Sequence, residues 1–173
     1  MSATLQRLLA TLALAGLAGA AFAACGDAVS LPEPEPCPIV SPLPTSAATP
    51  RVTQGRAYFT ALQNSLEHLQ DQLQRFKLDH PNNRFSRDDA FRPSVAGFID
   101  DSTCVALAIT ALQAPSQQFQ QSRAKLDAAL DDYVALLASG RAAIKSRNVT
   151  DYRTFYDGLD PKFQAIRDAA SQR

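Results

Sequence analysis

Three cysteines are the side chains of this sequence most able to form covalent bonds, and their number is odd. They are Cys25, Cys37 and Cys104. In an oxidising compartment thiols pair as disulfides, and an odd count leaves one thiol for other chemistry. We expect a Cys37–Cys104 disulfide, with the two Cα atoms within about 7 Å of each other. A bridge to another chain, a free thiol, or a nucleophilic Cys104 paired with a distant histidine are the alternatives.

The other residues suited to catalysis or metal binding are scattered. His68 and His80 have no carboxylate at the Glu-x-x-His spacing of di-iron bundles, so we interpret them as surface or capping residues. The sequence has no zinc-spaced Cys/His set, calcium loop, phosphate-binding glycine loop or nucleophile elbow. Three isolated carboxylate doublets fit helix caps better than an acid–base pair: Asp88-Asp89, Asp100-Asp101 and Asp131-Asp132. We therefore expect no catalytic residue, cofactor or metal.

Four aromatic residues are the candidates for lining a ligand pocket. Tyr133, Tyr152, Phe155 and Tyr156 fall in the last two helical stretches, and a cavity between those helices could bind a small apolar or aromatic molecule. Aromatic residues at the spacing of a buried helix face are more often core residues. The pattern favours core packing, with a ligand pocket as the alternative.

The N-terminal residues have the order of a secretory signal peptide. Arg7 supplies one positive charge, and residues 8–23 form an apolar run that ends in small residues. This run of about 16 residues is shorter than the roughly 20 that span a bilayer, and we expect no later segment to span one. Cleavage after Ala21-Phe22-Ala23 would release a soluble protein that begins at Ala24.

A second processing site overlaps the first. Phe22-Ala23-Ala24-Cys25-Gly26 resembles the lipobox of bacterial lipoproteins, with Phe22 where leucine is usual. The resemblance covers only this signal region, and it implies that Cys25 becomes the acylated, palmitate-bearing first residue. Acylation would also account for the odd cysteine. It implies an extracytoplasmic protein anchored to a membrane by lipid, and soluble secretion is the alternative.

A proline-rich stretch separates this signal from the rest. Residues 31–50 hold seven of the 11 prolines, so we expect extended backbone there. A polyproline spacer over residues 26–50 could reach roughly 75 Å if nothing folds it back. The expected disulfide would pin it beside the small residues of the second helix, Gly97, Ala108 and Ala111. The predicted divisions are a signal over 1–24, an anchor and linker over 25–50, and a domain over 51–173.

Apolar residues at helical spacing predict four helices in that domain. The first is expected over 51–79, the second from about 94 to 113 and the third from about 116 to 147. The last follows, with Asn148 or Thr150 as its candidate cap. Ser86 could cap a short helical turn in the connection before the second helix. The expected apolar faces are Phe59, Leu62, Leu66, Leu69, Leu73 and Phe76; Val95, Phe98, Ser102, Val105, Ile109 and Leu112; Phe119, Leu126, Leu130, Tyr133, Leu137 and Ile144; and Tyr152, Phe155, Leu159, Phe163 and Ile166.

Four amphipathic helices predict an all-α, antiparallel four-helix bundle, with the last helix kinked or broken near Pro161. A dimer of long helical hairpins is the alternative. Basic and acidic residues number 17 each, which predicts no binding to nucleic acid by bulk charge. We expect a non-catalytic, membrane-tethered module that binds a protein or envelope component. A small-ligand-binding lipoprotein and an unrecognised hydrolase are the alternatives.

Overall fold

The chain forms four long helices in the part that the computed structural model describes, residues 30–34, 36–38, 51–114 and 119–171. Their bounds are α1 Arg51–Asp79, α2 Phe91–Ala111, α3 Gln120–Ser146 and α4 Val149–Ser171. Residues 1–30 are divided from Leu31–Arg173, and the four helices belong to the second unit. The description that follows concerns this second unit.

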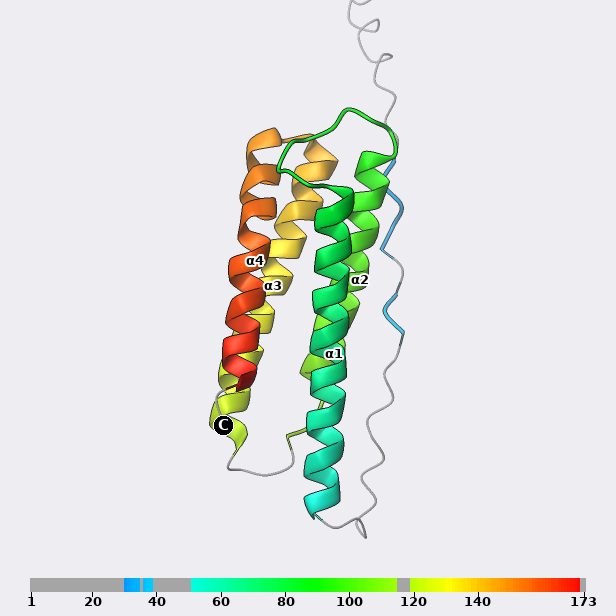
Figure 1. The fold of residues 1–173 in the computed structure, drawn as a ribbon. Coiled ribbons are helices and arrows are strands. Elements are labelled where there is room, and N and C mark those ends of the chain that lie inside the picture. The colour runs from blue at the N-terminus through cyan, green and yellow to red at the C-terminus, as the bar shows by residue number, and fades with distance from the viewer. Residues whose placement is uncertain (1–29, 35, 39–50, 115–118, 172–173) are drawn as a thin grey trace, which may run out of the picture. The chain divides into compact units, whose positions relative to one another are not determined.

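The helices form an antiparallel bundle in which chain neighbours lie side by side (Figure 1). The α3–α4 interface is the most extensive, followed by α2–α3 and α1–α2, whereas α1 and α4 touch at few points. Each helix therefore packs on two others, and the α1–α4 side lies opposite the α2–α3 side. The predicted all-α four-helix bundle is confirmed.

The core follows the expected apolar faces, with one shift in α1 and with Val105, Leu112 and Phe119 only partly buried. Leu130, Leu137 and Ile144 of α3 are fully buried within the single chain, so the bundle needs no second chain to cover them. In α1, Tyr58 is buried in place of Phe59, which is 39% exposed. The remaining expected residues of α1 and α4 are buried, apart from Leu66, which only packs against the edge of the core.

Helix ends explain where the predicted boundaries were wrong. The second helix begins at Phe91 rather than near residue 94, because Pro93 lies in the first turn, where a missing backbone N–H costs nothing. Ser86 caps no helix in the described connection; its hydroxyl accepts a hydrogen bond from the Asp88 amide at 3.1 Å in a local turn. The expected cap at Asn148 is confirmed, since its side-chain oxygen accepts hydrogen bonds from the amides of Thr150 and Asp151.

Two glycines explain the close packing of α3 on α4. A Cβ added to Gly140 would lie 2.4 Å from the Phe155 ring, and one added to Gly158 would lie 3.1 Å from Leu136. Gly158 is therefore a point of close helix approach. Of the two outcomes expected near Pro161, a kink or a break, the break does not occur, because α4 continues to Ser171 with Pro161 inside it. Proline has no backbone N–H, so the Asp157 carbonyl receives no helical hydrogen bond from it.

Among the described residues, α2 is long and apolar enough to cross a membrane by length and composition. The expectation that no later segment approaches that length is therefore wrong for α2. Its apolar side chains, Val95, Ile99 and Ile109 among them, are buried against the other helices, as expected for the core helix of a bundle.

Candidate binding groove and N-terminal strap

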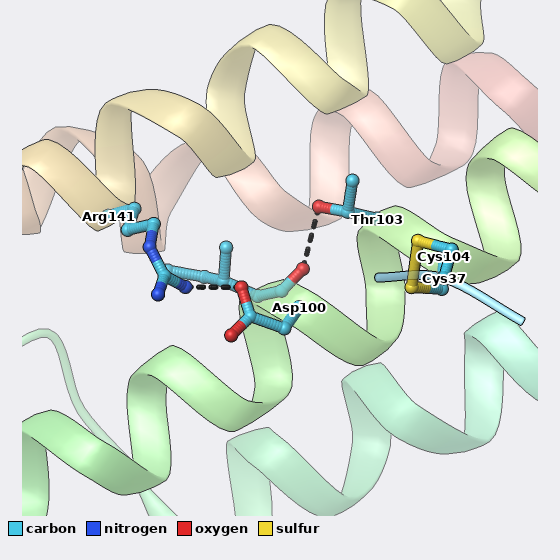
Figure 2. The surroundings of a disulfide bond; sticks show 6 residues. Cys37, Asp100, Thr103, Cys104 and Arg141 are labelled. Carbon is cyan, nitrogen blue, oxygen red and sulfur yellow. Dashed lines mark hydrogen bonds and ion pairs between the residues drawn. A yellow bond between two sulfur atoms is a disulfide. The ribbon is translucent and has the colours of Figure 1, made fainter. Parts of the chain in front are cut away.

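A segment of the proline-rich stretch is fastened to the outside of the bundle (Figure 2). Cys37 is bonded to Cys104 of α2, with a Cα–Cα distance of 5.2 Å, so the predicted disulfide is confirmed. Upstream of it, the Pro32 carbonyl accepts a hydrogen bond of 2.6 Å from Arg141 of α3, and Leu31 packs against the core. We call residues 31–38 the strap.

Arg141 links the strap to both helices beneath it. Its guanidinium forms an ion pair with Asp100 of α2 while it donates to the Pro32 carbonyl. Asp100 therefore lies inside a helix and neutralises an arginine, rather than capping a helix end as its doublet suggested. Nothing in the sequence pattern indicates this role for Arg141, because the segment it holds is 109 residues away in the chain.

Of the small residues that were expected to receive the linker, Gly97 is not covered by the strap. Gly97 is exposed, and a Cβ added there would meet nothing within 4 Å. The prediction that the linker packs beside Gly97 is therefore wrong. Side-chain bonds at Cys104 and Arg141 hold the strap, so close backbone approach to a glycine is unnecessary.

The open side of the bundle, between α1 and α4, holds an elongated groove of about 1030 Å³. Figure 1 shows the two helices that border it. Its apolar lining comes from α1, α4 and the residue before α3: Phe59, Leu62, Leu66, Phe119, Phe163 and Ala170. The ring of Phe59 meets that of Phe119 edge to face, with 5.4 Å between the ring centres. No α2 residue is among the described residues that line the groove.

A second hollow of about 490 Å³ extends the groove toward the other end of α1. The two share Gln70, Phe163 and Arg167. Leu78, which is 79% exposed, lies in this extension. Lys77 borders it, where its ammonium group pairs with Asp160 at 3.2 Å and lies 3.8 Å from the centre of the Tyr156 ring.

Charge in the groove is unevenly distributed. Lys77 and Asp160 neutralise each other, and Glu67 accepts a hydrogen bond of 2.9 Å from Gln63. The exposed Arg56 and Arg167 form no ion pair within the described part of the chain. Positive charge is therefore in excess at the end of the groove where α1 begins and α4 ends.

The aromatic candidates are core residues. Tyr133, Tyr152 and Phe155 are fully buried, and Tyr156 is nearly so. None of the four lines the groove or its extension. Burial raises the pKa of the Tyr133 and Tyr152 hydroxyls, and neither hydroxyl has a hydrogen-bond partner among the described residues, although Ser102 lies near Tyr133. All four residues stabilise the bundle as core residues, and the ring of Tyr152 also packs on those of Phe155 and Tyr156.

The two histidines differ in their surroundings. His68 is exposed on α1, whereas His80 is half-buried between the rings of Phe76 and Phe91. The ring of His80 lies 3.0 Å from the Ser94 hydroxyl, and desolvation lowers its pKa against the opposing charge of Asp79. The described residues contain no group of three potential metal ligands.

Arg123 was not identified from the sequence. Its guanidinium donates hydrogen bonds of 2.9 and 2.7 Å to the carbonyls of Ile109 and Thr110, which end α2. Burial alone would lower its pKa, but bonds to Asp127 and Tyr58 outweigh that effect and raise it. Arg123 thereby links the start of α3 to the end of α2, beside the groove. Only the unsatisfied carbonyls at a helix end could have signalled this role.

The candidate acylation site, Cys25, lies outside the described residues, as does the signal segment. Comparison with protein-family models, curated protein sequences and solved structures found no match to this chain. The functional interpretation therefore depends on the groove and the strap.

Proposed function

We propose that this protein is an exported, lipid-anchored and non-catalytic module that binds a protein partner in the α1–α4 groove. The observation that carries the proposal is the groove itself, with the side chains of Phe59 and Leu78 exposed along α1. The groove presents exposed apolar side chains beside polar ones, a mixture that protein–protein interaction sites share. The lipobox-like sequence before Cys25 supports the anchor.

The position of the strap supports a particular orientation, in which the groove would lie on the side of the bundle away from the anchor. It is fixed to α2 and α3, on the side of the bundle opposite α1 and α4. An anchor at Cys25 would reach the bundle at Leu31, six residues later, over at most about 20 Å of extended chain. The domain would then be held close to the membrane by one side while the groove remains accessible on the other.

The experiment compares four chains in the cells that export them: wild type, Cys25→Ser, Phe59→Glu and Leu107→Glu. Leu107 is a matched control, because it is 47% exposed on α2 and does not line the groove. Membranes are isolated, and the size of the detergent-solubilised assembly is measured by native electrophoresis.

We expect Cys25→Ser to leave the membrane fraction and Phe59→Glu to lose the larger assembly, with Leu107→Glu behaving as wild type. Membrane retention of Cys25→Ser would contradict the anchor. An assembly that is unaffected by Phe59→Glu, or is affected equally by both glutamates, would contradict the groove as the binding site.

A further inference from the structure

The occupant of the groove can be specified more closely, on the premise that the proposed function holds. We infer that the partner docks a single amphipathic α-helix with acidic residues beside its apolar stripe. Three observations lead to this inference: the shape of the groove, the pattern of its exposed apolar side chains and its excess of positive charge.

The shape suits a helix better than a small molecule. On α1 the lining extends from Arg56 to Leu78, about 33 Å of helix, and on α4 from Asp160 to Ser171, about 16 Å. The groove is open to solvent along this length, whereas small-molecule sites usually enclose most of the ligand surface. A helix of three to four turns would lie along α4 and fill the side of the bundle where α1 and α4 barely touch.

The apolar residues of the lining fall on one face of each bordering helix. Phe59, Leu62 and Leu66 succeed one another at three and four residues along α1, and Phe163 and Ala170 are one heptad apart on α4. Phe59 is the most exposed of the five. Leu62 and Phe163 are already buried and form the floor of the groove, so a partner helix with an apolar stripe would cover Phe59, Leu66 and Ala170.

The charges select an acidic helix over a second copy of this chain. Arg56 and Arg167 both line the groove. Among the described residues, Glu67 is the only carboxylate that lines it with them. A second copy would bring the same excess of arginine to the interface, and like charges oppose docking. Glutamates on a partner helix would instead pair with both guanidinium groups.

The experiment uses a defined probe on the purified, detergent-solubilised full chain. The probe is a fluorescent 14-residue peptide with leucine at i, i+3, i+4 and i+7 positions and glutamate on both flanks of that stripe. Its partner peptide carries lysine at each glutamate position. Both are titrated by fluorescence anisotropy against wild type, Arg56→Glu/Arg167→Glu and the control Arg153→Glu. Arg153 is exposed on α4 and does not line the groove.

We expect the acidic peptide to bind wild type and Arg153→Glu roughly five-fold more tightly than the basic one at low salt. The preference should shrink as salt is added and reverse in the double variant. Circular dichroism checks that each variant is folded.

Equal affinity for the two peptides, or no binding of either, would overturn the inference. Self-association of wild type that Phe59→Glu abolishes would identify a second copy as the occupant. Capture by anionic vesicles that the peptide does not compete for would identify a lipid surface. If the Phe59→Glu assembly result holds while the acidic peptide fails, the proposed function stands and only the acidic-helix inference falls.

Discussion

Single residues set the spacing of α3 and α4, and Gly140 is the most constrained of them. We expect Gly140→Ala to lower the free energy of unfolding by about 1 to 3 kcal/mol, because its Cβ would overlap the buried Phe155 ring. The matched control is Gly97→Ala in α2, where a Cβ meets nothing within 4 Å. That variant should gain up to about 1 kcal/mol of stability from helix propensity. Urea denaturation measures the free energy of unfolding of both variants. A Gly140→Ala variant that is as stable as Gly97→Ala, or more stable, would contradict the close α3–α4 contact.

His80 should make stability depend on pH. Its folded-state pKa is lowered by desolvation from the ordinary value of 6.5, so the unfolded chain binds the proton more readily. The free energy of unfolding should therefore be fully maintained above pH 6.5 and should fall as the pH decreases from there toward the lowered folded-state value.

Urea denaturation of wild type and His80→Gln at pH 7.5 and pH 5.5 checks this dependence. The variant should lose less stability than wild type between the two values. A loss of the same size in both proteins would place the pH dependence on other groups.

At the scale of elements, the strap should stabilise the bundle through the disulfide. Closing a loop between residues 37 and 104 is worth about 4 kcal/mol in the chain-entropy treatment. We expect Cys37→Ala/Cys104→Ala to lower the free energy of unfolding by up to that amount. Reductant should destabilise wild type similarly and leave the double variant unchanged. Reductant that destabilises both proteins equally would contradict a Cys37–Cys104 bond.

The sequence predicted most elements, because four helices with one apolar face each have few ways to bury those faces. The four helices, the disulfide and the Asn148 cap were all predictable from spacing, cysteine count and cap chemistry. The start of α2 and the continuity of α4 were not, because Pro93 and Pro161 suggested boundaries that the packed bundle does not have. Tertiary packing of a long apolar face outweighs one missing hydrogen bond.

The groove could not be predicted, since it depends on how two helices distant in sequence approach each other. Periodicity assigned Phe59 to the core, but packing buries Tyr58 and leaves Phe59 partly exposed between α1 and Phe119. The contact between Arg141 and the strap could not be predicted either, because the strap is far from Arg141 in the sequence. The residue types at single positions indicate neither the groove nor the contact between Arg141 and the strap.

At the scale of the whole molecule, the two sides of the bundle have different roles. The disulfide and Arg141 fasten the strap to the α2–α3 side, while the α1–α4 side offers the groove. This separation would allow a chain anchored at Cys25, as proposed, to bind a partner at the same time. The central claim is that the partner contacts the groove in the exporting cell.

Site-specific photocrosslinking tests this claim most directly. A photoreactive residue replaces Thr60, which is exposed in the groove, or Leu107, which is exposed on α2, and intact exporting cells are irradiated. We predict one discrete heterologous adduct from position 60 that is absent from position 107 and is lost when Phe59→Glu is added. Adducts from position 107 but not from position 60, or the same adducts from both, would contradict the account.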